Sequence, residues 1–448
     1  MKKRELFGTD GVRGVANQEL SVHLSLRIAR AAATVLRRQG DARPCVVMGR
    51  DTRISGEMIA AAMTAGFCSA GADVIDMGVM PTAGIAYLAQ VLDVDLGAVI
   101  SASHNPFEFN GIKFFSHEGF KLPDDVELAI EERVNSTEHL DHPLGDKIGR
   151  VIPAGDNAEK YLDYLRKLAP DGLAGLHLVV DCANGAASHI APALLRELGA
   201  KVTEIHCEPD GININEGCGA THVDVVMNAV KELGADAGLS FDGDADRLMM
   251  ADELGQKMDG DHIMAMVGYI LHQQGKLACD CIVGTVMSNL GFERALQQMG
   301  IEMVRAQVGD RYVLEEMQRR GAAIGGEQSG HLIFLEESTT GDGLVTALVV
   351  LSMLRASGKK LSFFHDLMKD YPQQLINVTV ASVKGWETHA DIMNAIAEAE
   401  ADLGTEGRIL VRASGTEPKI RVMIEALDQT KVDHWTPLIA DIVKKSMV

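Results

Sequence analysis

One local pattern occurs three times in the chain and restricts its fold. A short apolar run leads through a loop of small and polar residues into a helix-length amphipathic stretch, which ends at a glycine before another apolar run. The first apolar runs of the three copies are residues 45–48, 178–181 and 282–286. Short strands that alternate with helices ending at glycine are typical of βαβ units and a mostly parallel sheet. We therefore predict an α/β protein with functional loops at the carboxyl ends of its strands.

The length of the chain sets the number of such units. At about 150 residues per domain, 448 residues correspond to about three domains, and four lie within the spread of that relation. Stretches rich in proline and turn-forming residues separate the repeats, and the segment after Pro372 has an α+β pattern. The predicted domains are residues 1–155, 156–254, 255–370 and 371–448.

Composition limits the partners and the compartment. A net charge of −21 argues against nucleic acid or an anionic membrane surface as the main partner. No apolar run approaches the ~20 residues that a membrane span requires, and the basic start lacks the apolar stretch of a signal peptide. The seven cysteines are scattered without a CxxC pair, which favours reduced thiols. We expect a cytoplasmic protein.

The first loop of chemical interest is SASHNP at residues 101–106, directly after an apolar strand. A hydroxyl at the end of a strand, followed by His104 and a proline that stops a helix, would present Ser103 in a crevice. Lys113 adds a cation ten residues further on. The alternative is an ordinary turn, since serine, asparagine and proline are common turn residues.

The second loop carries three carboxylates, at Asp242, Asp244 and Asp246, after another apolar strand. Alternate side chains of an extended segment point the same way, and three like charges so close repel unless a cation joins them. Oxygen ligands favour Mg²⁺ or Ca²⁺. An EF-hand is excluded because Arg247 stands where its sharp turn needs glycine. The alternative is a solvated acidic turn.

The third loop is GGEQSGH at residues 325–331. Its glycines allow the backbone to approach a ligand, and Glu327, Ser329 and His331 offer an acceptor, a hydroxyl and a titratable group suited to a sugar. A polar turn would have the same composition. The loop alone therefore does not decide between the two.

The fourth loop has the composition of a phosphate site. Two guanidinium groups, two hydroxyls and a glycine can bind a dianion; these residues are Arg412, Ser414, Gly415, Thr416 and Arg421. No Walker motif or GxGxxG occurs, so the phosphate need not belong to a nucleotide. A surface hairpin with ordinary charges is the alternative.

The four loops together suit phosphoryl transfer on a phosphosugar. They combine a hydroxyl nucleophile, a divalent-metal site, a group of sugar-binding side chains and a phosphate site. An acidic chain should repel an anionic substrate, so local cations must outweigh the overall field, which salt screens beyond ~8–10 Å. The candidates for that role are Arg13, Lys113, Arg247, Arg412 and Arg421.

The same loops resemble, in order, the signature loops of the α-D-phosphohexomutases. The matching segments are ISASHNP at 100–106, FDGDADR at 241–247, GEQSGH at 326–331 and RASGTEP at 412–418. Segments 7–14, 105–115, 211–222 and 308–313 resemble the bacterial members that act on glucosamine phosphates. The resemblance spans almost the whole chain. It implies three related α/β domains with mixed, mostly parallel sheets and a smaller C-terminal α+β domain around a central cleft.

The resemblance also implies a reaction. Members of this type interconvert glucosamine 6-phosphate and glucosamine 1-phosphate, on the route to UDP-N-acetylglucosamine and cell-wall precursors, through a sugar 1,6-bisphosphate that is both intermediate and activator. Ser103 matches the phosphoserine, and Ser103, Asp242, Asp244 and Asp246 match the ligands of one Mg²⁺. Relatives are commonly dimers, so a homodimer is one expected state.

Other family residues carry over by position. Lys113 and His331 match candidates for general acid and base, and Arg13 would help to hold the transferring group. Glu327 and Ser329 match residues that bind sugar hydroxyls, while the fourth loop would bind whichever phosphate is not reacting.

Three alternatives remain open within this interpretation. A mutase for glucose or mannose would use the same loops, although Asp310 and Arg311 stand where those enzymes have a histidine, which favours an amino sugar. A non-catalytic phosphosugar sensor would be expected to lack the nucleophile or a metal carboxylate, and all are present. A phosphatase would release inorganic phosphate.

Overall fold

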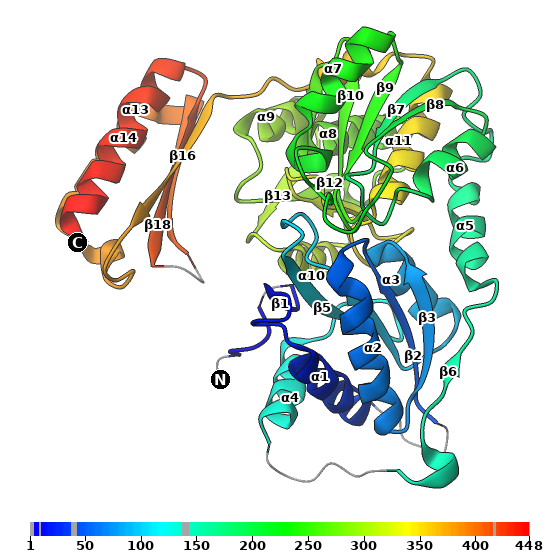
Figure 1. The fold of residues 1–448 in the computed structure, drawn as a ribbon. Coiled ribbons are helices and arrows are strands. Elements are labelled where there is room, and N and C mark those ends of the chain that lie inside the picture. The colour runs from blue at the N-terminus through cyan, green and yellow to red at the C-terminus, as the bar shows by residue number, and fades with distance from the viewer. Residues whose placement is uncertain (1–3, 9, 37–42, 137–142, 415–417, 448) are drawn as a thin grey trace. The chain divides into compact units, whose positions relative to one another are not determined.

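The computed structural model describes residues 4–8, 10–36, 43–136, 143–414 and 418–447, which form two compact units. The larger unit contains Met1–Met287 and Ile301–Asp366, and the smaller contains Ser288–Gly300 and Leu367–Val448. The three repeats predicted from the sequence each contribute strands to a sheet of the larger unit. The described part of the smaller unit has its own sheet (Figure 1).

The first sheet of the larger unit is mixed. Its strands lie in the order β1 (Val12–Val15), β5 (Phe109–Ser116), β4 (Leu96–Ile100), β2 (Cys45–Arg50), β3 (Asp73–Val79) and β6 (Val151–Ile152). The pairs from β4 to β6 are parallel, and β5 runs antiparallel to both of its neighbours. The accompanying helices are α1 (Val22–Val35), α2 (Ile54–Ser69), α3 (Thr82–Val91), α4 (Asp124–Asn135) and η1 (Gly145–Lys147).

Alternate residues of β2 face different helices. Val46 and Met48 share a core with α1, α2 and α4, whereas α3 contacts β2, β4 and β5 outside that core. Because side chains alternate along a strand, the two sets of helices cover opposite faces of the sheet. The carboxyl end of β2 lies beside the amino end of α3, since the amide of Met80 donates to the carbonyl of Arg50 at 3.0 Å.

The second sheet has a related topology. Its strands lie in the order β11 (Lys257–Met258), β10 (Leu248–Asp252), β9 (Ala237–Phe241), β7 (His177–Asp181) and β8 (Lys201–Ile205), with β9, β7 and β8 parallel. The hairpin of β9 and β10 is antiparallel and is joined by the residues between Phe241 and Leu248. The helices of this region are α5 (Asn157–Lys167), α6 (Ala191–Glu197), η2 (Gly219–Thr221) and α7 (Asp224–Leu233).

The third sheet is smaller. It contains β13 (Glu302–Ala306), β12 (Cys281–Thr285), β14 (Ile324–Gly326) and β15 (Leu332–Phe334), and only its β14–β15 hairpin is antiparallel among these described pairs. The helices are α8 (Gly260–Gln273), η3 (Ala278–Asp280), α10 (Asp310–Arg320), α11 (Gly343–Ser357) and α12 (Leu361–His365).

The smaller unit contains an antiparallel sheet, against which the helices α13 (Ala390–Leu403) and α14 (Gln429–Ser446) pack. The strands lie in the order β16 (Gln373–Thr379), β18 (Lys419–Ala426) and β17 (Gly407–Ala413). The other helices are α9 (Leu290–Met299), η4 (Trp386–Thr388) and η5 (Gly404–Glu406). Residues of α13 and α14 share one apolar core with the sheet. The predicted fold class, three α/β units with mixed, mostly parallel sheets and a smaller α+β C-terminal part, is confirmed.

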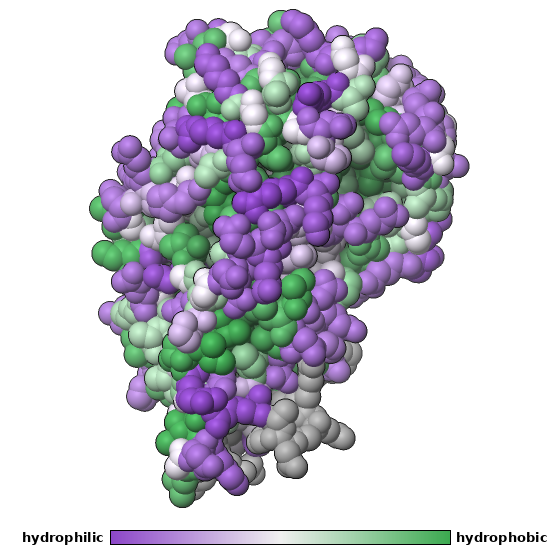
Figure 2. Space-filling view, turned by 90° about the vertical axis from the view of Figure 1, so that its right-hand side faces the viewer, coloured by the Kyte–Doolittle hydropathy of each residue, from purple (hydrophilic) through white to green (hydrophobic). Residues whose placement is uncertain are grey.

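The cores are aliphatic, as the low aromatic content of 4% requires. One apolar cluster combines valine, isoleucine, alanine and methionine from β2, α1 and α2. Hydrophilic residues are spread over the face drawn in Figure 2, with smaller apolar areas between them. Among the helices of the described ranges, none combines the length and the apolar character needed to span a bilayer.

Candidate functional site

Ser103 lies in the loop after β4 and is almost completely buried. Its backbone has a φ of +52°, a left-handed conformation that few residues other than glycine adopt. The hydroxyl donates to Oδ2 of Asp242 at 2.6 Å, and the amide donates to Oγ of Ser101 at 2.9 Å. Two polar contacts therefore fix both the backbone and the side chain of the predicted nucleophile.

Arg53, at the start of α2, forms hydrogen bonds with the backbone of the same loop. Its Nη2 donates to the carbonyls of Ser103 and Asn105 at 2.9 Å each, and its Nη1 donates to the carbonyl of Pro106 at 2.5 Å. Its Nε binds Asp51 at 2.9 Å, with both side chains wholly buried. Asp51 also accepts from the Ser101 hydroxyl at 2.6 Å. The hydrogen-bonding groups that the buried Arg53–Asp51 ion pair does not use between its own members thus bind the loop that carries Ser103.

The three aspartates of the second loop converge, as predicted. Asp242, Asp244 and Asp246 are buried, and each offers an oxygen within 4.8 Å of the others. A β-carbon on Gly243, between the first two, would lie 2.6 Å from the carbonyl oxygen of Ser103, so only glycine allows the two loops to meet. The Thr82 hydroxyl at the start of α3 donates to Asp244 at 2.6 Å.

The donor set fits a hard divalent cation. Oδ1 of Asp244 and Oδ1 of Asp246 are buried and have no hydrogen-bond partner among the described residues. Burial raises the pKa of Asp242 well above its usual range, and the like charges of Asp246 and Asp244 add to this shift. Converging oxygens with free lone pairs and mutual repulsion are what a Mg²⁺ or Ca²⁺ ion relieves.

Lys113 is the nearest side-chain cation to these carboxylates. Its Nζ lies 2.9 Å from Asp244, 3.3 Å from Asp246 and 3.1 Å from Asp10. Burial opposes the charge, but Asp10 and the two loop aspartates hold the pKa of Lys113 well above its usual range. Lys113 is therefore an ammonium ion that neutralises part of the acidic loop.

Further charged side chains form a closed ring of ion pairs that includes Lys113, which we call the charge ring. Lys121 binds both Asp10 and Asp310, the latter at 2.5 Å. His331 lies between two carboxylates, with Nε2 3.5 Å from Asp310 and Nδ1 3.6 Å from Asp246. Acids and bases thus alternate from Asp246 through Lys113, Asp10, Lys121, Asp310 and His331 back to Asp246. Burial lowers the pKa of His331, but its two carboxylate neighbours raise the pKa to about 10.

Other predicted residues lie around the same loops. Oε1 of Glu327 accepts from the Gly309 amide at 2.9 Å, and Ser329 donates to Oε2 at 3.2 Å. Arg247 is mostly buried, and its Nε lies 3.8 Å from Asp246. Nδ1 of His104 lies 3.4 Å from the Ser103 hydroxyl, and burial together with Arg247 and Arg13 lowers the pKa of His104 to about 4.

Arg13 in β1 has an acidic partner, Asp10. It forms an ion pair with Asp10, and its Nε is buried without a hydrogen-bond partner in the described structure. That unpaired donor is available to an anion. Arg13 therefore remains a candidate for binding the transferring phosphate.

The fourth loop, with the residues predicted to bind phosphate, belongs to the smaller unit. Arg412 in β17 and Arg421 in β18 are directly opposite each other in the antiparallel register. Burial lowers the pKa of Arg412, and Arg421 adds a like-charge contribution. Nε of Arg421 is buried without a partner among the described residues, and Ser414 follows β17. Gly415 and Thr416 lie outside the described residues.

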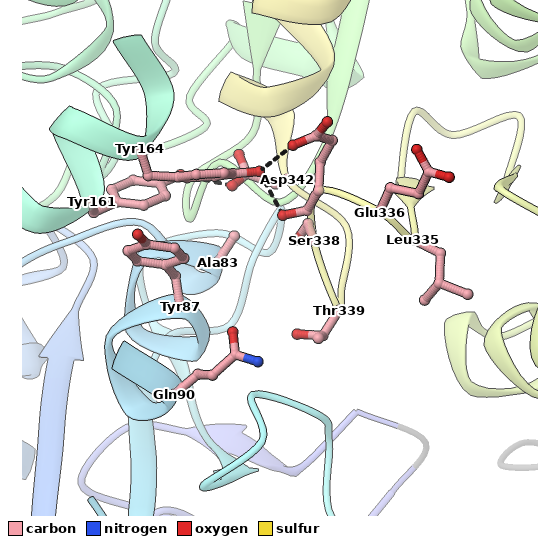
Figure 3. A pocket seen from close by; sticks show the side chains of 11 residues that line it. Ala83, Tyr87, Gln90, Tyr161, Tyr164, Leu335, Glu336, Ser338, Thr339 and Asp342 are labelled. Atoms are coloured by element: carbon pink, nitrogen blue, oxygen red, sulfur yellow. Dashed lines mark hydrogen bonds between the residues drawn. The ribbon is translucent and has the colours of Figure 1, made fainter. Parts of the chain in front are cut away.

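A pocket of about 130 Å³ lies apart from Ser103, beside the helices α3 and α5. Tyr87, Tyr161 and Tyr164 stand on one side of it, and segment 335–342 forms the other (Figure 3). Tyr161 donates to Asp342 at 2.7 Å. Because Asp342 also accepts the Leu344 and Val345 amides, it caps α11. The tyrosines and the cap account for the pocket as a packing feature.

Family models match all four parts of the chain. The phosphoglucomutase/phosphomannomutase alpha/beta/alpha domains I, II and III match residues 4–141, 159–255 and 259–371, and the C-terminal domain of the same family matches residues 375–442. The chain belongs to the phosphoglucomutase/phosphomannomutase family. The Ser103 loop lies within the domain I match, and the aspartate loop lies within the domain II match.

Members of this family match over the full chain. Phosphoglucosamine mutase of Alkaliphilus oremlandii is 49% identical over 446 residues, covering 99% of each chain. Phosphoglucosamine mutase of Desulforudis audaxviator is 50% identical over 440 residues, covering 98% of this chain and 97% of the relative. A phosphoglucomutase/phosphomannomutase family protein from Burkholderia thailandensis shares the fold, with a TM-score of 0.80 at 24% identity and coverage of 98% and 97%.

Sequence reasoning missed the residues that support the nucleophile and complete the charge ring. Asp51 and Arg53 stand in GRDTR, at the end of a predicted strand, where the strand-end rule should have drawn attention to them. Asn215 donates to the carbonyls of Ser103 and Asn105 at 2.9 and 3.1 Å. Asp10 and Lys121 had no local signal, because their role depends on which loops meet.

Proposed function

We propose that this protein is a phosphoglucosamine mutase, an isomerase that interconverts glucosamine 6-phosphate and glucosamine 1-phosphate. Full-length relatives at about half identity carry that name. The observation that carries the proposal is the Ser103 hydroxyl, 2.6 Å from the first of three converging aspartates. Glucosamine 1-phosphate made in this way would serve UDP-N-acetylglucosamine and cell-wall precursor synthesis.

Ser103 is the proposed phosphoryl carrier. In the first half-reaction, the bond from phosphorus to Oγ breaks, a bond to O1 of glucosamine 6-phosphate forms, and the O1 proton passes to a base. In the second, the phosphoryl group at position 6 of the 1,6-bisphosphate returns to Oγ, and O6 receives a proton. Lys113 and His331 are the proposed acid and base candidates, since both lie against Asp246 at the loop that binds Ser103. Their raised pKa values favour the acid role in the metal-free protein, and a cation bound to the aspartates would lower those values towards the range of a base.

Mg²⁺ is the proposed metal, held by Asp242, Asp244, Asp246 and an oxygen on Ser103. When bound, it would polarise the transferring phosphoryl group and neutralise charge on the serine oxygen as it leaves. The unpartnered oxygens of Asp244 and Asp246 support this assignment. Lys113 reduces the remaining negative charge beside the anionic substrate.

The other residues have binding and positioning roles in this proposal. Arg53 and Asp51 keep Ser103 in its left-handed conformation, so that Oγ faces the aspartates. Arg13, Arg247 and His104 would bind the transferring phosphate, and Glu327 and Ser329 the sugar hydroxyls. The unreacting phosphate would bind Arg412, Ser414, Gly415, Thr416 and Arg421. The unpaired Nε of Arg421 supports the last assignment.

The family assignment and the charge extend the proposal to the setting of the enzyme. We propose a cytoplasmic enzyme of small phosphosugars, since a chain with net charge −21 is poorly suited to binding nucleic acid or anionic lipid. A homodimer is the oligomeric state we propose. Sedimentation of the purified protein would test that state directly.

A ³¹P NMR time course tests the reaction. The protein, Mg²⁺ and a trace of sugar 1,6-bisphosphate are mixed separately with the 6-phosphates of glucosamine, glucose and mannose, beside a Ser103→Ala control. We expect glucosamine 1-phosphate to form fastest and the reaction to stop in the control. Faster conversion of glucose or mannose would overturn the amino-sugar assignment, and steady release of inorganic phosphate would indicate a phosphatase.

A further inference from the structure

A second group of metal-binding side chains lies one strand away from the acidic loop. Asp181 ends β7, His206 follows β8, and Cys218 precedes η2. Their ligand atoms, an oxygen, a nitrogen and a sulfur, all lie within 4.8 Å of one another. Asp181 pairs with Ser240, the next-to-last residue of β9, so the group lies at the carboxyl edge of the same sheet, beside the strand that carries the acidic loop.

The three side chains differ in burial and in the hydrogen bonds that orient them. Asp181 and Cys218 are wholly buried, whereas about a third of the His206 ring is exposed. Oδ1 of Asp181 accepts the Ala183 amide at 2.9 Å, and Oδ2 accepts the Gly219 amide at 3.0 Å. Backbone amides that orient a ligating carboxylate are a regular feature of metal sites.

The imidazole of His206 gives the more specific indication. Its Nδ1 is buried and lies 3.2 Å from Oδ2 of Asp181, with which it forms an ion pair when the imidazole is protonated, and it makes no hydrogen bond of regular geometry in the described parts of the chain. The neighbouring carboxylate raises the pKa of His206. A metal ion bound by both side chains would take the place of that proton.

The thiol adds a chemical preference. Burial raises the pKa of Cys218 to about 12, with Asp181 and Glu216 adding negative charge nearby. A thiol in such a place becomes a thiolate only when a cation replaces its proton. Ions that accept one sulfur, one nitrogen and one oxygen belong to the zinc class, whereas the oxygen-only triad at Asp242 suits Mg²⁺.

We propose that Asp181, His206 and Cys218 form a second metal site, which takes one divalent ion of the zinc class. The fourth coordination position would be left to solvent, on the side where His206 is exposed. The proposal does not depend on the mutase activity.

An ion here would act on the nucleophile loop through the chain between its ligands. Residues 206–218 run from one ligand to another, and this segment contains Asn215, which donates to the carbonyls of Ser103 and Asn105. Binding would tie both ends of the segment to β7. We therefore expect the ion to raise the melting temperature of the protein.

Cobalt absorption tests the site separately from the acidic loop. Co²⁺ is titrated into the full-length protein in excess Mg²⁺, which occupies the oxygen-only site. Only a cysteine ligand gives a thiolate-to-cobalt charge-transfer band, and four-coordinate Co²⁺ gives strong visible bands. We expect one equivalent of Co²⁺ to produce both signals and to raise the melting temperature.

Three variants locate the signal. Cys218→Ser should lose the charge-transfer band, and His206→Asn, at a partly exposed position, should weaken Co²⁺ binding at least tenfold while keeping the fold. The matched control is Cys207→Ser, because the Cys207 thiol instead donates to the carbonyls of Ile205 and Val180. No band in the unmodified protein, or a band that survives in Cys218→Ser, would overturn the proposal.

Discussion

Arg53 donates to the main-chain carbonyl of Ser103 at 2.9 Å, across fifty residues of sequence. The guanidinium also binds the carbonyls of Asn105 and Pro106, so one planar side chain fixes three points of the nucleophile loop. Lysine cannot reproduce this fork because its donors radiate from one nitrogen. The geometry of Ser103 therefore depends on the identity of Arg53 and not only on its charge.

Replacing Arg53 by lysine should reduce kcat roughly 100-fold with little change in KM, because a misplaced nucleophile costs about that much. Buried carbonyls left without donors should also destabilise the fold by ~1–3 kcal/mol. Steady-state kinetics and thermal melting measure both effects. Arg50→Lys is the matched control, because Arg50 pairs with the exposed Glu57. Equal loss of activity in both variants would contradict the positioning role.

Asp242→Asn should make the metal-free protein more stable and catalytically much weaker. An amide relieves the repulsion that raises the pKa of Asp242, and it can still accept the Arg247 amide while donating to Ser103. Mg²⁺ should raise the melting temperature of the unmodified protein through binding. That increase should be much smaller in the variant, as thermal melts with and without chelator would reveal. A larger Mg²⁺ effect in the variant would exclude Asp242 as a ligand.

The charge ring should behave as a coupled unit. Lys121→Met leaves Asp10 and Asp310 without their shared cation, and removing one partner of a buried pair costs ~3–5 kcal/mol. Asp310→Asn should reduce the free energy of unfolding by less, since Lys121 still forms its ion pair with Asp10. In a double-mutant cycle we expect a coupling of ~0.5–3 kcal/mol, with the double variant more stable than the sum of the single effects. Strict additivity would mean that the ring is not an energetic unit.

Arg412→Gln should weaken substrate binding without weakening the fold. The variant relieves repulsion from Arg421, its direct cross-strand partner, which is worth ~0.2–1 kcal/mol. Loss of a hydrogen bond to a charged phosphate should raise KM ~10–100-fold. Stabilisation by inorganic phosphate should also decrease. Lys431→Gln is the control, because Lys431 pairs with Asp402 at the surface and should leave both quantities unchanged.

Asp342 should give the protein a pH-dependent stability. Burial raises its pKa from 3.8 to about 6, so the folded state binds a proton more tightly than the unfolded state does. The carboxylate therefore destabilises the fold above pH 6, and this cost disappears as the pH falls from about 6 towards 4. Relative to Asp342→Asn, which keeps the helix cap, the unmodified protein should gain up to ~3 kcal/mol over that interval. Melting temperatures of both proteins measured from pH 7.5 to 4.5 provide the comparison. If the two proteins showed the same dependence on pH, the raised pKa of Asp342 would be refuted.

The strand-end loops could be predicted because their signals are local. Ser103 follows the apolar strand β4 of the first sheet, and the three aspartates follow the apolar strand β9 of the second. In each sheet the loops at the carboxyl ends of parallel strands are the expected place for functional residues. Arg53 shows the limit of this reasoning. The helix of the first repeat begins at Ile54, so Arg53 directly precedes it and reaches the Ser103 loop. Neither residue spacing nor composition states which distant loop a buried arginine will meet.

The charge ring was even harder to predict from the sequence. Lys113 and His331 were predicted from their own loops, with acid and base roles implied by the resemblance, but Asp10 and Lys121, which lie between them in the ring, were not predicted. Their pairing depends on β1 lying against β5 and on α10 presenting Asp310 beside Lys121. Such contacts are set by long-range packing, on which a single sequence carries no direct information.

The ring also has a consequence for how the protein is made. Its members extend from Asp10 to His331, so a ribosome must add 85 residues after Asp246 before the last of them exists. At roughly 5–20 residues per second this interval is on the order of ten seconds. During that time the newly made aspartates lack one of their counter-charges. Early closure of the first two α/β units would therefore be electrostatically unfavourable, and assembly of this site is expected to wait for the third.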